Sequence, residues 1–190
     1  MLRFLPRFLF MQSFFRYVLY HLMGWRAEVS VELPQKYIIA LAPHTSNWDF
    51  VMGQLYSRAE GFRCEFMMKK EWFFWPLGPL FRRMGGIPVE RKRHMSLTDQ
   101  LARTALERKN FGLCITPEGT RKPVTEWKRG FYYIALKAKL PILLFGLDYG
   151  QKRIVCTKCI IPTGDADAQM QEIKEYFREF QGKVPENFVI

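Results

Sequence analysis

The sequence KYIIALAPHTSNWD, residues 36–49, contains the pattern on which the fold prediction rests. Its first half, Lys36–Ala42, is a short apolar run that predicts a buried strand. Ser46 is a suitable helix N-cap, and the residues after it predict a helix that runs to about Arg58. A buried strand that passes through a short loop into a helix is the repeating unit of α/β domains.

Similar strand and helix patterns alternate along the rest of the chain. Further short apolar strands are predicted at residues 64–68, 86–89, 111–116, 142–147 and 154–161. Helices are predicted at 95–109, 130–139 and 165–181, and an aromatic-rich helical stretch broken by prolines at 71–84. The predicted buried face of the helix at 95–109 is Leu97, Leu101, Ala105 and Leu106. The alternation predicts one α/β domain with a mainly parallel central sheet flanked by helices.

The composition of the 190-residue chain favours a folded protein that works at a membrane surface. Hydrophobic residues make up 48% and charged residues 25%, which supports a folded core rather than disorder. The net charge of +11 attracts phosphate, whether in nucleic acid, anionic lipid or a phosphorylated substrate. Together with an aromatic share of 16%, this charge favours a membrane surface, and we expect no nucleic-acid partner.

Four cysteines are present, and they give little sign of a disulfide framework or a metal site. Cys156 and Cys159 form a C-x-x-C, but they lie inside a predicted strand. A zinc site usually needs a second pair of ligands, and none is visible in the sequence. We therefore expect inert thiols in a reducing compartment, and no bound metal.

The first 25 residues predict an amphipathic helix separate from the domain at residues 26–190. Arginines at positions 3, 7 and 16 interrupt the apolar run that a membrane-spanning helix requires. Phe8, Met11, Phe15, Val18 and Leu22 recur at helical spacing and form the predicted apolar face. Such a helix suits a position in the membrane interface, with its arginines near lipid phosphates. The alternative is a helix packed on the domain.

His44 and Asp49 are the candidate catalytic pair. His44 follows the predicted strand, and Asp49 comes five residues later in the first turn of the predicted helix. Reactive groups in α/β sheets gather outside the carboxyl ends of strands, and a carboxylate on one ring nitrogen leaves the other as a general base. The alternative is a histidine that begins a helix and an aspartate that only caps it.

Two further loops carry charges that suit a phosphorylated ligand. GGIPVERKR, residues 85–93, ends a predicted strand in a basic cluster formed by Arg91, Lys92 and Arg93. ITPEGTRK, residues 115–122, opens from an apolar strand into a loop with a carboxylate, a glycine, a hydroxyl and cations. Lys128 and Arg129 lie nearby in the sequence and could extend this surface. A solvated basic turn and an ordinary polar connection are the alternatives.

Four motifs in this order make the chain similar to the lysophosphatidic acid acyltransferase family, within the glycerolipid acyltransferases. The first is a His, four residues and an Asp, HTSNWD at 44–49. The second is a strand ending in Arg, GIPVER at 86–91, and the third is PEGTR at 117–121. The fourth is a proline followed by apolar residues, LPI at 140–142. The resemblance extends over more than half of the chain.

The resemblance implies an O-acyltransferase that forms phosphatidic acid from lysophosphatidic acid (1-acylglycerol-3-phosphate). His44 would be the general base and Asp49 would orient it. The acyl donor would be acyl-CoA or acyl-carrier protein, without a bound cofactor. A backbone N–H near Gly119 could stabilise the oxyanion. The acceptor site would contain Arg91, Glu118, Gly119, Thr120 and Arg121.

The resemblance also implies a peripheral or monotopic enzyme at the cytoplasmic face of a membrane, whose acceptor is a lysophospholipid. The aromatic run EWFFWPLGPLF, residues 71–81, would line an acyl tunnel, touch lipid or pack in the core. Other acceptors remain open, such as glycerol-3-phosphate or a lyso-aminolipid. The alternatives from other classes of protein are a basic nucleic-acid-binding module and a hydrolase with Ser46 as its nucleophile. No nucleic-acid motif and no G-x-S-x-G supports them.

Overall fold

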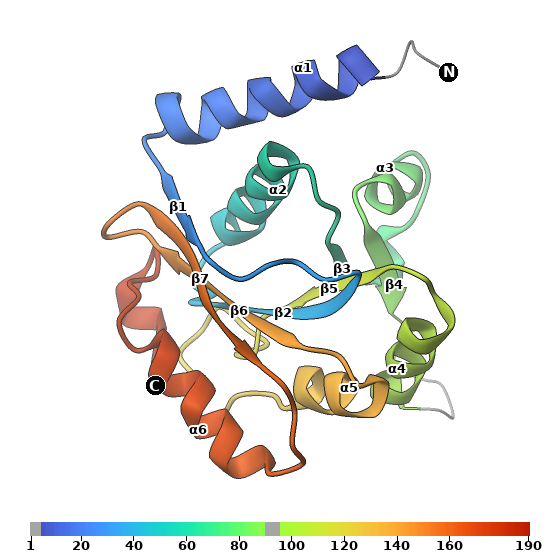
Figure 1. The fold of residues 1–190 in the computed structure, drawn as a ribbon, viewed down its shortest axis with the longest axis vertical. Coiled ribbons are helices and arrows are strands. Elements are labelled where there is room, and N and C mark those ends of the chain that lie inside the picture. Colours follow the sequence, from blue (N-terminus) through green and yellow to red (C-terminus); the bar gives the residue numbers. More distant parts are fainter. Residues whose placement is uncertain (1–4, 90–95) are drawn as a thin grey trace.

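The computed structural model describes residues 5–89 and 96–190, with side chains from residue 10 onward, and contains one seven-stranded sheet (Figure 1). The strand order is β1-β7-β6-β2-β5-β3-β4. Neighbouring strands are parallel except β6 and β7, which are antiparallel. The strands are β1 (Arg26–Val29), β2 (Lys36–Ala42), β3 (Glu65–Lys69), β4 (Gly86–Val89), β5 (Phe111–Ile115), β6 (Ile142–Asp148) and β7 (Arg153–Ile160). The predicted mainly parallel sheet is confirmed.

Helices cover both faces of this sheet (Figure 1). On one face lie α1 (Leu5–Arg16) with its π-helical continuation η1 (Tyr17–Leu22), α2 (Trp48–Glu60) and α3 (Leu77–Arg83). On the other lie α4 (Leu97–Glu107), α5 (Gly130–Ala138) and α6 (Ala166–Phe177). Two single 3₁₀ turns, η2 (Lys70–Trp72) and η3 (Pro185–Asn187), complete the described elements. The order of layers is helix, sheet, helix, as the alternating pattern predicts.

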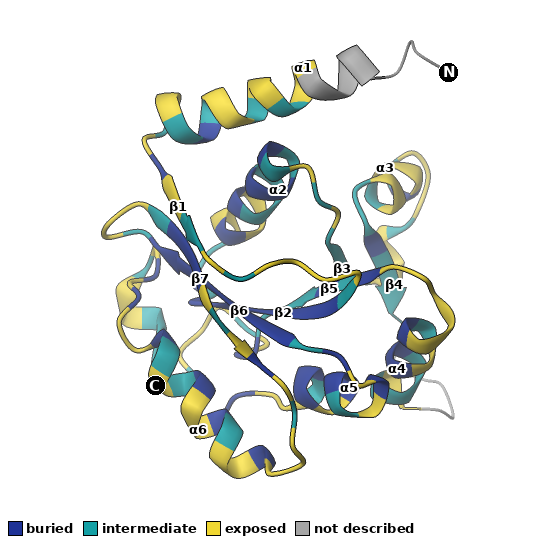
Figure 2. Ribbon diagram, in the orientation of Figure 1, coloured by how far each residue is buried: buried dark blue, intermediate teal, exposed yellow. Residues whose placement is uncertain are grey.

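The core lies along β2 and β6, the strands at the centre of the sheet (Figure 2). Side chains alternate across β2: Ile38 and Ala40 join the cluster on the α4–α6 side. Tyr37, Ile39 and Leu41 join the cluster on the α2 side. Because both faces of β2 are covered by helices, its sequence is continuously apolar rather than alternating. This rigid central strand positions the loop that follows it.

One strand is absent from the sequence prediction, and one predicted helical face is wrong. β1 is a short edge strand with the polar sequence RAEV, which pairs in parallel with β7. A half-solvated edge strand needs no apolar run, so hydrophobicity gives no signal for it. On α4, Leu97 and Leu106 are exposed by 38% and 58%, while Leu101 and Ala105 are buried with Ala102. Leu106 follows Ala105 by one residue and therefore points about 100° away from the buried face.

The predicted apolar face of the N-terminal helix is also wrong in part. Met11 and Leu22 are exposed, Phe15 and Val18 are half-buried, and Phe8 lies among the residues whose side chains are not described. Of the helix side chains described from residue 10 onward, the fully buried one is instead Leu19, which packs in the same cluster as residues of β2. The chain changes to π-helical geometry at Tyr17–Leu22, where backbone hydrogen bonds join residues five positions apart. The side chains that follow are therefore rotated away from the positions that a 3.6-residue period predicts.

The N-terminal helix packs on α2. The Tyr20 hydroxyl donates to Glu60 Oε1 at 2.7 Å, and Arg16 Nη1 donates to Glu60 Oε2 at 3.2 Å. Arg58 lies over the Phe15 ring, with Cζ 5.6 Å from its centre. The side of the helix that carries Phe15, Arg16 and Tyr20 is therefore packed on the domain, as the alternative interpretation expected. The division of the chain into two parts at residue 25 stays a prediction.

The C-x-x-C lies within β7, as predicted. Cys156 is buried and Cys159 is exposed, and both are free thiols. Burial raises the pKa of the Cys156 thiol to about 12, which disfavours the reactive thiolate. Among residues 5–89 and 96–190 no helix has the length and hydrophobicity needed to span a bilayer.

Candidate active site

His44 lies just beyond the carboxyl end of β2, in the loop that leads to α2. Its Nδ1 is 3.1 Å from Oδ2 of Asp49, which lies in the first turn of α2. The Asp49 side chain is fully buried and that of His44 is 21% exposed. The carboxylate thus faces one ring nitrogen from the protein side and leaves Nε2 as the nitrogen available to a substrate. The predicted contact between the two residues is confirmed.

The loop itself holds the Asp49 carboxylate in place. The backbone N–H groups of Thr45 and Ser46 both donate to Asp49 Oδ2 at 2.8 Å. The predicted N-cap is one residue off, because Asn47 is the N-cap and makes no side-chain capping bond. The Ser46 hydroxyl accepts instead from the Trp48 N–H at 3.2 Å. Asp49 therefore folds back onto the loop before the helix rather than only capping the helix, which favours the catalytic interpretation over capping alone.

Tyr149 is a site residue that the sequence analysis did not find. It directly follows β6, which runs parallel to β2, and its hydroxyl donates to Asp49 Oδ1 at 2.8 Å. Burial, followed by the nearby Asp49 charge, raises the pKa of Tyr149 far above its usual value, so the phenol stays protonated. Its signal in the sequence was its position: a polar residue at the carboxyl end of a strand next to β2.

Glu118 supports His44 from the loop after β5. Its Oε1 accepts the His44 backbone N–H at 2.9 Å, and the residue is 5% exposed. Burial raises the pKa of this carboxyl to about 7, partly offset by the hydrogen bond from His44. Its Oε2 is buried without a hydrogen-bond partner among the described residues. A protonated carboxyl is the natural form for such an oxygen, because an unpaired buried charge is costly.

The rest of the 117–121 motif forms a tight turn beside this carboxylate. Gly119 has φ of 66°, a left-handed conformation that favours glycine. Its N–H donates to Thr116 O at 3.1 Å, so in this conformation it is already used and does not serve as the oxyanion donor. The Thr120 hydroxyl accepts from the Lys122 N–H at 3.2 Å. Arg121 Nη1 donates to Asn47 Oδ1, which ties the turn to the His44 loop.

The other predicted cations are distributed differently. Arg91, Lys92 and Arg93 lie outside the described residues, and their predicted role in phosphate binding stays a prediction. Arg129 pairs with Asp167 of α6 at 2.6 Å, so this guanidinium is engaged away from the site. Lys128 is exposed, and its backbone N–H donates to Pro117 O at 2.7 Å. Among the predicted cations that lie in the described residues, Arg121 is the one whose side chain bonds to the His44 loop.

The C-terminal segment after α6 closes one side of the site. The Val184 N–H donates to the buried Thr45 hydroxyl at 3.2 Å, and Gly182 packs against Thr45 so closely that a Cβ would lie 2.7 Å from its Cγ2. Lys183 Nζ lies 5.5 Å from the centre of the Trp48 ring and 5.6 Å from that of Tyr149. Residues more than 130 positions apart therefore meet around the His44 loop.

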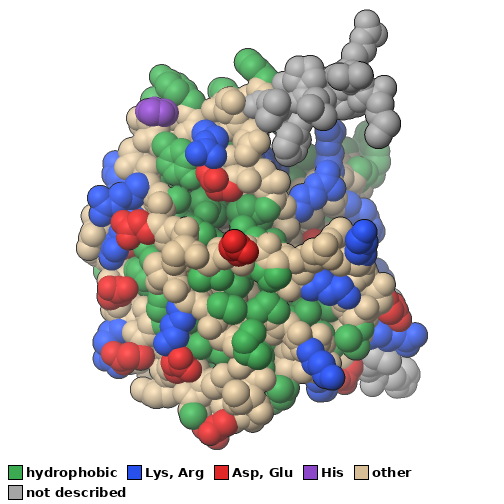
Figure 3. Space-filling view, in the orientation of Figure 1, with side chains coloured by type: hydrophobic (Ala, Val, Ile, Leu, Met, Phe, Trp, Pro, Cys, Tyr) green, Lys and Arg blue, Asp and Glu red, His purple; other side chains and the backbone are tan. Residues whose placement is uncertain are grey.

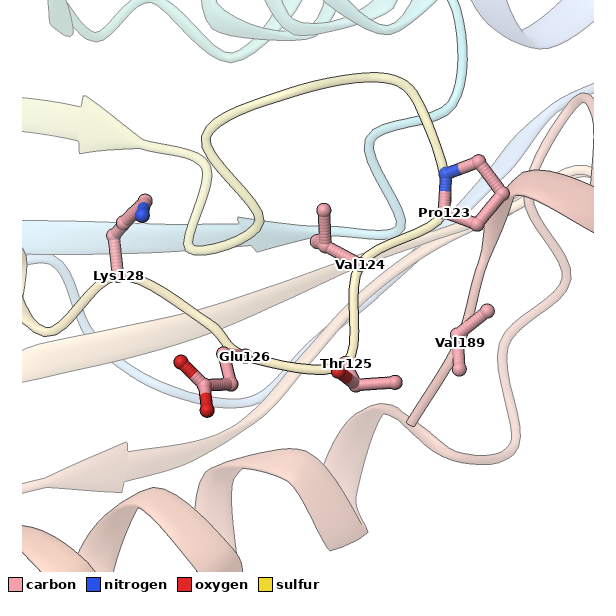
Figure 4. Close-up of a pocket in the computed structure, with 6 residues that line it drawn as sticks. All are labelled: Pro123, Val124, Thr125, Glu126, Lys128 and Val189. Carbon is pink, nitrogen blue, oxygen red and sulfur yellow. The ribbon is translucent and has the colours of Figure 1, made fainter.

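Two surface hollows in the described part of the chain lie away from His44 and Asp49, which line neither of them. One of about 440 Å³ lies between the 123–128 loop and Val189 (Figure 4). Its charged lining residues, Glu126 and Lys128, carry opposite charges, which gives no net preference for an anion. The other, about 490 Å³, lies between η1, β1 and α2. These two hollows therefore do not mark the site around His44 and Asp49.

Comparison with known proteins defines the class. Residues 26–146, well over half of the chain, match the family model described as Acyltransferase. The chain therefore belongs to the acyltransferase family, and the sequence resemblance is confirmed at the level of the family. The match begins at β1 and ends within β6, so it contains the His44 loop and the 117–121 turn.

A solved structure shows the same fold. The chain is similar to the 1-acyl-sn-glycerophosphate (LPA) acyltransferase PlsC from Thermotoga maritima, with a TM-score of 0.62. The similarity covers 89% of this chain and 76% of that one, at 16% sequence identity. At this identity the likeness establishes the fold. A comparison with curated protein sequences finds no significant match.

Proposed function

We propose that this acyltransferase moves a fatty acyl group from acyl-CoA or acyl-carrier protein to the free hydroxyl of 1-acylglycerol-3-phosphate, giving phosphatidic acid. The observation that carries the proposal is the contact between His44 Nδ1 and the buried Asp49 carboxylate. This contact occupies Nδ1 and supports a role for Nε2 as the nitrogen that faces the acceptor at the carboxyl edge of the sheet. Membership of the acyltransferase family and the similarity to an enzyme named for this substrate support the choice of reaction.

The proposed reaction is a direct transfer. His44 Nε2 takes the proton of the acceptor hydroxyl as its oxygen attacks the carbonyl carbon of the thioester. The tetrahedral intermediate collapses, the C–S bond breaks, and the leaving thiolate takes the proton back from the imidazolium. Asp49 orients the imidazole and stabilises its positive charge during the reaction. No covalent acyl-enzyme and no bound cofactor are required.

Two further residues have positioning roles in this scheme. Tyr149 holds the second oxygen of Asp49, so that Oδ2 stays directed at the imidazole. Glu118 holds the backbone of His44, and its burial favours this role over direct contact with the acceptor. The acceptor phosphate is assigned to Arg91 and Arg121, because guanidinium groups bind phosphate oxygens in pairs. Gly119 and Thr120 shape the turn that presents Arg121.

A single assay tests the reaction. Full-length protein is incubated with acyl-CoA or acyl-carrier protein and lysophosphatidic acid, and the lipids are analysed for phosphatidic acid. His44→Ala should abolish transfer while leaving the fold intact. His21→Ala is the matched control, because His21 is exposed on η1. Full activity in His44→Ala, or accumulation of an acyl-enzyme, would contradict the mechanism.

The acceptor is tested by a panel of substrates. Glycerol-3-phosphate and a lyso-aminolipid are the alternatives to lysophosphatidic acid. Arg121→Ala should raise the KM for a phosphorylated acceptor with less effect on the KM for the acyl donor. An equal effect of this substitution on a lyso-aminolipid that lacks phosphate would contradict the assignment of Arg121.

We also propose that the enzyme acts at the cytoplasmic face of a membrane and binds it peripherally through α1 and η1. Among the side chains described from residue 10 onward, five large hydrophobic ones of these elements are exposed: Phe10, Met11, Phe14, Tyr17 and Leu22. Hydrophobic side chains protrude along the upper edge of the molecule, where α1 lies (Figure 3). Deleting the helix would also remove the buried Leu19, so Phe10→Ser with Phe14→Ser is the better test. Unchanged partitioning of this double variant onto anionic vesicles would contradict the proposal.

A further inference from the structure

An aromatic segment, residues 69–83, leaves the sheet at the same edge as the candidate catalytic residues. It begins at the last residue of β3, and it contains η2 and α3 before the chain returns to β4. β3 is parallel to β5, and β5 is parallel to β2. The carboxyl ends of parallel strands meet at one edge, so this segment starts where the loops of His44 and Glu118 start. α3 lies on the same face of the sheet as α1 and α2 (Figure 1).

The outer side of the aromatic segment is apolar and open to solvent. Trp72 is 53% exposed, Phe74 55%, Trp75 83% and Leu80 51%. Core packing is therefore wrong as an account of these four side chains. Exposed aromatic and aliphatic residues gathered within nine positions are unusual on a soluble surface and indicate a contact with an apolar partner.

The inner side of the segment is held firmly by the domain. Phe73 and Phe81 are half-buried with ring centres 6.1 Å apart. A Cβ on Gly78 would lie 2.6 Å from Phe73 O, and one on Gly86 would lie 3.2 Å from Phe73 Cζ. The exposed side chains are thus carried on a backbone that is packed against the sheet, which presents them without the ordering cost of a loose loop.

Positive charges frame the exposed aromatic residues. Lys69 and Lys70 precede them, Arg82 and Arg83 follow them, and all four are exposed, against a single acidic residue, Glu71. Arg82 Cζ lies 5.3 Å from the centre of the Phe73 ring. Tryptophan side chains flanked by cations are the composition that protein segments use at the interface of an anionic bilayer. A neutral protein surface would give no reason for this charge.

We infer that the aromatic segment is a second membrane contact, in addition to α1, and that its partner is the surface of an anionic phospholipid bilayer. Trp72, Trp75 and Leu80 enter the interface while Arg82 and Arg83 contact lipid phosphates. Docking of this segment places the carboxyl edge of the sheet, with His44, against the lipid layer. This placement of His44 rests on the proposed function. It would let a lipid acceptor reach the site while the acceptor stays in the membrane.

Vesicle binding by full-length variants tests the inference. Leu80→Ser and Trp75→Ser are compared with the wild-type protein on phosphatidylcholine vesicles that contain phosphatidylglycerol. Each should weaken partitioning by about tenfold, because each removes a large apolar side chain from the interface. Leu106→Ser is the matched control, because Leu106 is 58% exposed on α4, on the other face of the sheet. Equal partitioning of all the variants would overturn the inference.

A charge variant tests the choice of lipid. Arg82→Gln with Arg83→Gln should reduce binding to anionic vesicles several-fold and leave weak binding to pure phosphatidylcholine unchanged. The same loss on both vesicle types would overturn the assignment of an anionic partner. Thermal unfolding of each variant verifies that the fold is retained.

Activity measurements separate this inference from the proposed function. Leu80→Ser should transfer acyl groups normally to a short-chain, water-soluble acceptor, while its activity on vesicle-embedded acceptor falls with its binding. If Leu80→Ser binds vesicles like the wild-type protein but prefers a different acyl chain length, the inference is overturned. The segment would then line an acyl-chain site. Vesicle binding is also measured in His44→Ala, so failure of the proposed reaction leaves the test of membrane contact intact.

Discussion

The Tyr149 hydroxyl donates to Asp49 Oδ1 at 2.8 Å while His44 Nδ1 lies 3.1 Å from Oδ2 of the same carboxylate. The two oxygens of Asp49 therefore have separate partners, one from the end of β6 and one from the loop after β2. With the N–H groups of Thr45 and Ser46 also on Oδ2, the carboxylate cannot rotate without breaking several bonds. An imidazole aligned in this way needs no rearrangement when it accepts a proton.

Tyr149→Phe should lower kcat about tenfold and leave the KM for the acyl donor nearly unchanged. The ring remains to pack against Trp25, so the loss is limited to one hydrogen bond to a charged group, worth about 1.5–3 kcal/mol. Steady-state kinetics measure both parameters. Tyr133→Phe, on the exposed side of α5, is the control and should behave as wild type. A change in KM alone would show that Tyr149 acts in binding rather than in positioning Asp49.

Asp49→Asn should reduce kcat by about a hundredfold or more with the fold intact. An amide has one acceptor oxygen, so it cannot accept from Tyr149 and also orient His44 in the reactive tautomer. Single-turnover kinetics with saturating substrates measure the chemical step directly. If thermal unfolding shows that Asp49→Asn is inactive only because it is unfolded, the result gives no support for an orienting role of Asp49.

Glu118→Gln should make the free energy of unfolding less dependent on pH, because it removes the titrating carboxyl group. The folded-state pKa of about 7 lies above the usual value of 4.5, so the folded protein favours the protonated carboxyl. Its contribution to stability is fully present below pH 4.5 and is lost as the pH rises through about 7. Each unit of pKa difference corresponds to about 1.4 kcal/mol, so the effect amounts to a few kcal/mol at most.

Urea denaturation at pH 5 and pH 8 measures this difference. The free energy of unfolding of the wild-type protein, taken relative to Glu118→Gln, should fall between the two pH values. The amide of the variant side chain retains an oxygen that can accept the His44 N–H. Glu126→Gln, exposed in the neighbouring loop, is the control and should keep the wild-type slope. Parallel curves for wild type and Glu118→Gln would contradict the raised pKa.

Gly119→Ala and Gly53→Ala should change stability in opposite directions. At Gly119 the φ of 66° disfavours a side chain, and its Cβ would lie 3.1 Å from Lys128 Cγ, so a loss of about 1 kcal/mol is expected. At Gly53, inside α2, nothing lies within 4 Å of the added Cβ, so alanine should stabilise by about 0.5–1 kcal/mol. Thermal unfolding of the two variants decides this; a stabilised Gly119→Ala would contradict the strained turn.

Most of the fold could be predicted from sequence because its strands are buried on both faces. Lys36–Ala42 and Gly86–Val89 are observed with the predicted bounds. The segments that were missed or misread lie where burial is partial: β1 at the edge of the sheet, and Leu106 in the last turn of α4. In such partly buried elements, the spacing of apolar residues does not predict which side faces the core.

The sequence by itself determined the parallel sheet, the family, and the meeting of His44 with Asp49, because each depends on local order: a strand, a short loop and the first turn of a helix. Tertiary structure alone decided that Tyr149 holds Asp49, that Lys183 lies over the Tyr149 ring, and that the buried Glu118 accepts the His44 N–H. It also decided that Leu19 rather than Met11 is buried in the N-terminal helix. These contacts join residues far apart along the chain. They follow from strand order and from the π-helical turn, and neither can be read from the spacing of residues.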